Sequence, residues 1–148
     1  MDPPVLTTSF IKPQRSALVP AFVLAAVVGV FVAGTAFAKI TRNTIDPVVL
    51  VTQQGRQLVV TGPAVCDRIE WVDQRVTVTQ RATGAVAEGR VRFVCSTGAQ
   101  QWEVHAATHG NEVFAPGPAT AVAVAVTGSG GVATDSHQWL VNITLVAQ

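Results

Sequence analysis

The sequence lacks an excess of charge of either sign. Charged residues make up 13% of the 148-residue chain, and the formal net charge is +1. Beyond residue 38 the charges balance, because eight arginine and lysine residues accompany eight aspartate and glutamate residues. Proteins that bind nucleic acid or an anionic lipid surface through charge carry a basic patch. The composition therefore excludes nucleic acid as an expected partner.

The sequence also lacks the short motifs that mark common catalytic and cofactor sites. It contains no Gly-x-Ser-x-Gly elbow and no phosphate loop ending in Gly-Lys-Ser/Thr. Of its three histidines only His105 and His109 lie close in sequence, whereas a metal site needs three or four converging ligands. Asp67, Glu70 and Asp73 form an acidic cluster without the spacing of a calcium loop. We therefore expect no catalytic activity, no cofactor and no bound metal.

The longest uncharged run, residues 16–38, follows two basic residues and stops at Lys39. It ends in Ala36-Phe37-Ala38, the small-x-small pattern typical of signal peptidase sites. About 20 apolar residues also suffice to span a bilayer as a helix. Residues 1–38 are therefore a signal peptide or a transmembrane anchor. Both alternatives predict an extracytoplasmic domain, either secreted or anchored to the cell membrane by residues 16–38.

After residue 47 the sequence changes to an alternation of period two, without a helical stripe. Short strands with no helices between them are typical of an antiparallel sandwich or barrel. We predict a single antiparallel immunoglobulin-like β-sandwich of about seven strands over residues 48–148, preceded by the N-terminal hydrophobic helix and a linker at residues 39–47. The turn signals of glycine, proline, aspartate and asparagine place the strands at residues 48–53, 57–66, 70–80, 86–95, 100–108, 119–127 and 137–147.

The same alternation predicts the core. Trp102 and Trp139 fall on the apolar parity of their strands, where each can bury about 200 Å². Trp71 is out of phase with its apolar neighbours, so we expect it on the other face or beside a bulge. The segment 119–126 alternates alanine and valine, which we interpret as a strand buried on both faces.

The sequence contains only two cysteines, and their positions in the predicted strands favour a disulfide. Cys66 shares the even, apolar parity of residues 57–66, and Cys95 shares the odd, apolar parity of residues 86–95. Both side chains are thus predicted to point inward. An exported chain with two inward cysteines is expected to join them. Closing this loop would stabilise the fold by about 3–4 kcal/mol.

The order of these features resembles a known group of proteins. Cys66 and Cys95 are followed by Gln101-Trp102-Glu103-Val104 and then by Phe114-Ala115-Pro116-Gly117, which leads into the alanine–valine strand. This order resembles small exported actinobacterial domains of unknown function with an immunoglobulin-like β-sandwich. The resemblance implies an all-β fold and a bridge between the two cysteines. It implies no catalytic residue and no particular ligand.

If the domain recognises a ligand, we expect loops at one end of the sandwich to carry the binding residues. The candidate segments are residues 67–70, 96–100 and 109–118. The candidate recognition residues in and beside them are Trp71, Asp67, Glu70, His109 and Phe114.

These features favour an exported, non-catalytic binding or cell-surface module. Its partner would be an unknown protein or surface ligand, and also the membrane if the N-terminal segment is retained. The alternative is a small-molecule carrier or inhibitor with an apolar cleft in the sandwich, lined by Trp71 or Phe114. An enzyme would instead need His105, His109 or His137 to converge with a carboxylate or serine in one cleft.

Overall fold

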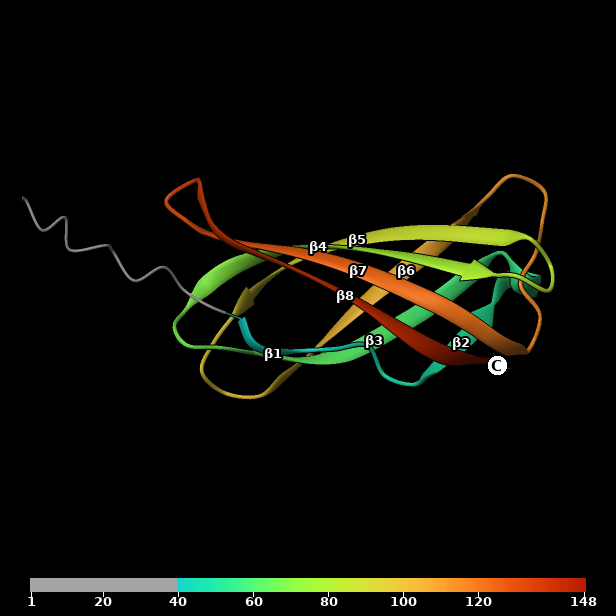
Figure 1. The fold of residues 1–148 in the computed structure, drawn as a ribbon, viewed down its shortest axis with the longest axis horizontal. Coiled ribbons are helices and arrows are strands. Elements are labelled where there is room, and N and C mark those ends of the chain that lie inside the picture. The colour runs from blue at the N-terminus through green and yellow to red at the C-terminus, as the bar shows by residue number, and fades with distance from the viewer. Residues whose placement is uncertain (1–39) are drawn as a thin grey trace, which may run out of the picture. The chain divides into compact units, whose positions relative to one another are not determined.

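The computed structural model describes residues 40–148, which form an all-β domain (Figure 1). All seven predicted strands are present, and one further strand precedes them. The predicted signal peptide or anchor, residues 1–38, lies outside the described residues. The elements are β1 (Ile40–Asn43), β2 (Val48–Thr52), the 3-10 turn η1 (Gln53–Gly55), β3 (Gln57–Cys66), β4 (Glu70–Gln80), β5 (Ala85–Cys95), β6 (Gln100–His109), β7 (Gly117–Ser129) and β8 (Val132–Ala147).

The strands close into a seven-stranded barrel, so the prediction of an immunoglobulin-like sandwich is wrong. The order around the barrel is β3-β2-β8-β7-β4-β5-β6, and β6 pairs back onto β3. That closing ladder is long, running antiparallel from Gln57↔Ala107 to Ala64↔Gln100. An inside–outside alternation is common to sandwiches and barrels. The sequence pattern therefore predicted the seven barrel strands, although β8 begins at Val132 and not at residue 137, but could not show which of their edges meet.

Two short ladders complete the barrel, and both lie at the end that holds η1. β5 and β6 pair over three positions, from Val86↔His109 to Glu88↔Ala107. β2 and β8 pair in parallel over four positions, from Val48↔Thr144 to Val51↔Ala147. At the opposite end of the described barrel, no ladder hydrogen bonds hold β5 to β6 or β1 to β8.

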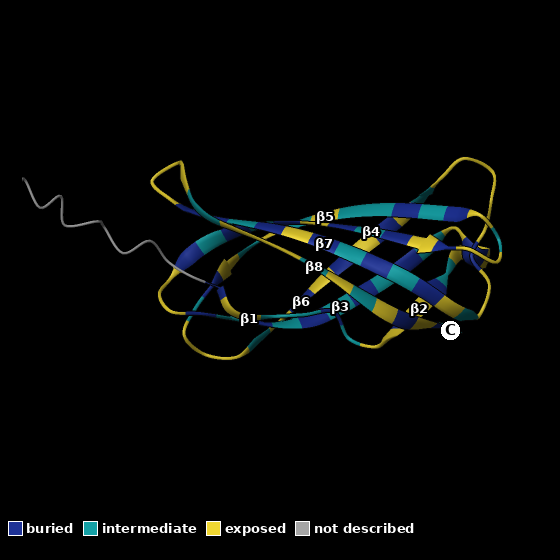
Figure 2. Cartoon of the chain, in the orientation of Figure 1, coloured by how far each residue is buried: buried dark blue, intermediate teal, exposed yellow. Residues whose placement is uncertain are grey.

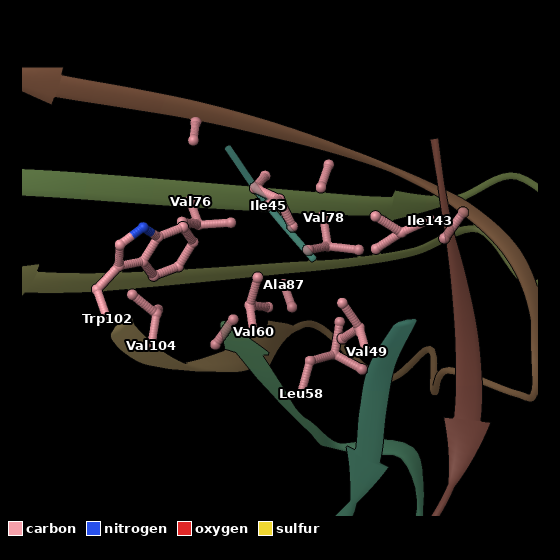
Figure 3. Packing of buried hydrophobic residues seen from close by; sticks show 14 of the residues in the cluster. Ile45, Val49, Leu58, Val60, Val76, Val78, Ala87, Trp102, Val104 and Ile143 are labelled. Atoms are coloured by element: carbon pink, nitrogen blue, oxygen red, sulfur yellow. The ribbon is translucent and has the colours of Figure 1, made fainter. Parts of the chain in front are cut away.

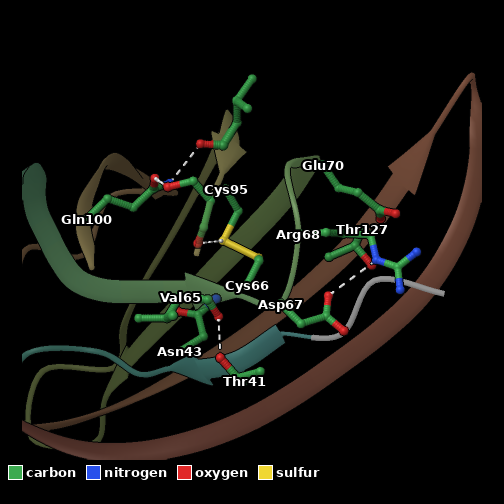
Figure 4. Close-up of a disulfide and its surroundings, with 12 residues drawn as sticks. Thr41, Asn43, Val65, Cys66, Asp67, Arg68, Glu70, Cys95, Gln100 and Thr127 are labelled. Atoms are coloured by element: carbon green, nitrogen blue, oxygen red, sulfur yellow. Dashed lines mark hydrogen bonds and ion pairs between the residues drawn. A yellow bond between two sulfur atoms is a disulfide. The ribbon is translucent and has the colours of Figure 1, made fainter. Parts of the chain in front are cut away.

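The disulfide supplies a link at this less paired end. Cys66 at the end of β3 and Cys95 at the end of β5 are bonded, with their Cα atoms 5.7 Å apart (Figure 4). Both side chains are buried, which confirms the predicted pairing and its inward direction. The Cys66 amide also donates to the carbonyl of Ser96 at 2.8 Å. Because β3 and β5 share no ladder, the disulfide and this hydrogen bond tie together two strands that are not paired with each other.

The segment expected to be a linker, residues 39–47, contributes to the fold instead of only preceding it. β1 pairs with the end of β3, and the Asp46 amide donates to Thr61 O at 2.8 Å farther along the same strand. Ile40 and Ile45 are buried in the core. β1 and β2 thus cover successive parts of one edge of β3, which the sequence alternation from residue 48 onward did not reveal.

Alternate side chains of the strands fill the barrel (Figures 2 and 3). Trp102 is buried in the core as predicted, 3% exposed, and its Nε1 donates to Asn43 Oδ1 at 2.9 Å. Trp139 is only partly buried and packs against the edge of this cluster. The remaining interior is mainly aliphatic, with the polar side chains of Gln74, Gln80 and Thr127 buried among it, so the described barrel is packed with its own side chains.

Strand β7 is buried on one face only, which corrects the prediction of a strand buried on both. Ala121, Ala123 and Ala125 point inward and are fully buried, whereas Val124 is 38% exposed and Val126 is partly exposed. β-branched residues favour strands whether or not they are buried. Here the valines lie on the outer wall, where no other described element covers them.

Candidate functional site

Trp71 lies on the outer face of the barrel, since the inner face of β4 is taken by Val72 and its alternates. The indole contacts Gly128 of β7, its register partner: a Cβ at that position would lie 1.9 Å from Trp71 Cζ2. Arg92 of β5 places its guanidinium carbon 4.5 Å from the indole centroid, a cation–π contact. Gly128 on one neighbouring strand thus leaves room for the indole ring, and Arg92 on the other neighbouring strand lies over it. Together they hold the ring against the outer face of the barrel.

Ion pairs continue from Trp71 along the same face. Asp73 accepts two hydrogen bonds from Arg90, one of them from Nε to Oδ1 at 2.6 Å. These bonds lower the pKa of Asp73 below its usual value, and the charges of Arg90, Arg92 and Arg75 lower it further. Arg75 pairs in turn with Glu88, Nε to Oε1 at 3.1 Å. Three arginines therefore meet two carboxylates on this face, which leaves one positive charge in excess.

The outer valines of β7 border these charges. Trp71, Val124 and Val126 supply apolar walls and the ion-paired residues supply polar ones, around an open hollow of about 400 Å³. We call this surface the outer patch. Its residues are Trp71, Asp73, Arg75, Arg90, Arg92, Val124 and Val126.

Among the residues predicted for recognition, Phe114 and Glu70 are buried. Phe114 is 4% exposed, and its amide donates to Gly55 O at 2.9 Å, so it fastens the loop before β7 to η1. Glu70 is 7% exposed and accepts a hydrogen bond from Thr134 Oγ1 at 2.7 Å. Both side chains therefore stabilise the domain and are not displayed to a partner.

Asp67 and His109 lie on the surface but do not join Trp71 in one site. Asp67 is beside Arg68 at 3.6 Å, in the loop before β4. His109, at the end of β6, lies 3.8 Å from Glu88. Asp67, Glu70 and Asp73 have different partners, and within residues 40–148 no three histidine, cysteine or acidic residues are grouped to hold a metal.

Sequence reasoning identified Trp71 as a candidate but missed its neighbours. From the sequence, none of Arg75, Arg90 and Arg92 is named as a candidate, and Val124 is assigned to a strand buried on both faces. The available signal was parity: Trp71, Asp73 and Arg75 alternate with the buried residues of β4 and so must share the outer face. Which other strands flank that face depended on the barrel order.

No protein-family model matches the chain, and no curated protein is significantly similar to it. Its function must therefore be argued from its own geometry. The disulfide is consistent with an extracytoplasmic location, where such bonds persist. In the described part of the chain, no helix has the length and apolar character needed to cross a bilayer.

The Asp73–Arg90 pair gives the outer patch a defined response to acid. Because the folded-state pKa of Asp73 is lowered, its stabilisation is complete above the unfolded pKa of about 4 and is lost as the pH falls through the folded value. We expect Asp73→Asn to reduce the free energy of unfolding by at most about 1 kcal/mol at pH 7. The difference from the wild type should shrink as the pH falls below the unfolded pKa. Urea unfolding at pH 7 and at an acid pH measures it.

The control for this prediction is Glu112→Gln, which neutralises an exposed carboxylate outside the outer patch. The Glu112 substitution should leave the unfolding free energy nearly unchanged at both pH values. A deficit in Asp73→Asn that is equally large at low pH would show that the asparagine disturbs packing, and would contradict the electrostatic account.

Proposed function

We propose that the protein is an exported, non-catalytic binding module that recognises a partner protein through the outer patch. The single observation that carries the proposal is the hollow beside Trp71, bordered by outward valines and arginines. The module is secreted, or is held at the membrane by residues 16–38. This function requires neither a cofactor nor a metal.

The composition of the outer patch favours a protein as partner. Tryptophan and arginine are enriched among the residues that dominate protein interfaces, and an exposed apolar hollow rimmed by polar groups is typical of interaction sites. Arg75 and Arg90 are solvent-accessible, with side chains 60% and 64% exposed. The excess positive charge suits a partner that places an apolar side chain in the hollow and a carboxylate beside it.

The alternative of a small-molecule carrier required a cleft between two sheets. The described barrel has a packed interior that contains Trp102 and the aliphatic core (Figure 3). Phe114, which was expected to line such a cleft, is part of that packing. Because these side chains fill the described interior, we propose the outer surface as the binding site.

Site-specific photo-crosslinking in the producing cells tests this function. A photoreactive phenylalanine at Val124 should link the protein to one extracytoplasmic protein, because that position borders the hollow. The same group at Ala107, an exposed position on β6 outside the outer patch, should give no such product. Equal products from both positions, or none from Val124, would contradict the proposal.

Trp71→Ala should abolish the Val124 product. Loss of a central tryptophan costs an interface about 2 kcal/mol or more, which is a roughly 30-fold or greater fall in affinity. The variant should still fold, because the ring lies outside the core, and near-ultraviolet circular dichroism with a thermal melt can establish this. A folded Trp71→Ala protein that binds its crosslinked partner normally would place recognition elsewhere.

A further inference from the structure

Strand β8 has a long edge that pairs with no other described strand. Its ladder with β7 runs from Val132 to Leu145, but its ladder with β2 begins only at Thr144, whose amide donates to Pro47 O at 2.8 Å. Peptide groups of alternate residues point to opposite sides of a strand. Gln138, Leu140 and Asn142 share the parity of Thr144, so they direct their N–H and C=O groups to this edge. We call residues 136–142 the open edge of β8.

The open edge is limited at its N-terminal end by the chain itself. The Ser136 amide donates to the Asp135 carboxylate at 2.8 Å, and the register between β7 and β8 shifts at Thr127/Gly128. Bulges are a common way to stop unwanted strand pairing, and an amide that donates to a neighbouring carboxylate is not available to another strand. Between this cap and the ladder with β2, the backbone groups have no such protection within the described residues.

Two buried donors inside the barrel lack an acceptor. Gln74 is fully buried, yet its Nε2 has no hydrogen-bond partner, and neither does the buried Nε1 of Trp139 on β8. The Gln74 amide is held beside β1, because its Oε1 accepts from Asn43 Nδ2 at 3.1 Å. Buried N–H groups are almost always satisfied in native proteins, because an unpaired one costs free energy. An acceptor is therefore missing from the described chain in the region where β1 and β8 do not pair.

We propose that the open edge of β8 binds an extended segment of a partner polypeptide as an added strand, with an inward oxygen acceptor that satisfies the buried donors. Main-chain bonds to Gln138, Leu140 and Asn142 would supply the affinity, as in other cases of β-strand addition. The inward side chain would be short and oxygen-bearing, such as asparagine, aspartate, serine or threonine, among small apolar neighbours. The inference does not depend on the outer patch.

The test uses the full chain, oxidised and isotope-labelled, in a mild detergent. The probes are acetylated nonapeptides of alternating valine and threonine. In each peptide one of the inward-facing positions is replaced, by asparagine in one version and by alanine in the matching version. At saturating peptide, amide hydrogen exchange of Gln138, Leu140 and Asn142 should slow at least tenfold. Amides already paired in the β4–β5 ladder, such as that of Val76, should not change.

Backbone methylation of the peptide distinguishes edge pairing from adsorption. Two versions carry N-methyl groups on alternate residues, one set on each side of the peptide strand. One version should lose binding completely and the other should retain it, because only one side can pair with β8. Equal binding of both versions would overturn the proposal, and so would slowed exchange at Val124 and Trp71 with none at the open edge.

Trp139→Phe tests the buried acceptor, since it removes Nε1 and keeps an aromatic ring. It should weaken the best asparagine peptide at least fivefold and leave the matching alanine peptide unchanged. Three results would overturn the proposal: no peptide protects the open edge, the edge is already protected in the free monomer, or protection rises only with protein concentration. The last result would identify a second copy of the chain as the occupant.

Discussion

Replacing both cysteines with alanine will lower the free energy of unfolding by about 3–4 kcal/mol. The bridge closes a loop between positions 29 apart, and constraining a loop of this size in the unfolded chain contributes about that amount. For a domain of this length the loss corresponds to a fall of roughly 15 °C in Tm. Urea unfolding of the double variant Cys66→Ala/Cys95→Ala, followed by tryptophan fluorescence, measures it.

The position of the disulfide predicts where the loosening appears. Amide exchange should accelerate most around residues 64–66 and 96–100, at the end of the barrel where β5 and β6 do not pair. The three-position ladder at the other end should remain protected. Reductant should destabilise the wild type to the level of the double variant and leave that variant unaffected. A double variant as stable as the oxidised wild type would show that the barrel does not need the bridge.

Replacing Gly62 with alanine will destabilise the domain by about 3 kcal/mol, within the range for overpacked sites. A Cβ at this position would lie 2.0 Å from the Thr44 carbonyl oxygen and 2.6 Å from Trp102 Cζ2. The first contact is with backbone, so no change of rotamer relieves it. The segment that carries Ile45 into the core would have to move away from β3. Chemical unfolding measures the loss, and faster amide exchange at Asp46 would locate it.

Gly98 provides the matched control for this prediction. Its backbone is not in the left-handed region, and a Cβ there would come no closer than 3.9 Å to Ser96 Oγ. Gly98→Ala should therefore leave the unfolding free energy within about 0.5 kcal/mol of the wild type. Similar effects of the two substitutions would mean that the glycines act through chain flexibility and that close approach of Thr44 is unimportant.

The strands and their facing residues could be predicted because alternation is a local property. Residues 57–66 and 70–80 were located to the residue, and the inward parity of Cys66 and Cys95 followed from their neighbours. β1 escaped prediction because it has only four residues, three of which pair, and they carry no alternating pattern. The valines of β7 were assigned to the core because an apolar residue gives the same sequence signal on an uncovered outer wall.

The site depended on information that no local pattern holds. The parity of Trp71 placed it away from the core, but its contacts with Gly128 and Arg92 arise from two strands distant in sequence. Phe114 and Glu70 looked equally suited to recognition, yet both are buried by elements that lie far from them along the chain. Residue type alone could not separate displayed side chains from packed ones.

By itself the sequence determined the approximate strand positions, the inward direction of the cysteines and the overall balance of charge. These properties depend on composition and on near neighbours. Only the tertiary structure decided that the sheet closes into a barrel and which residues surround Trp71. It also decided that β8 keeps an open edge. Edge pairing joins residues up to about 100 positions apart, and the free energy that selects one closure over another arises only when those edges meet.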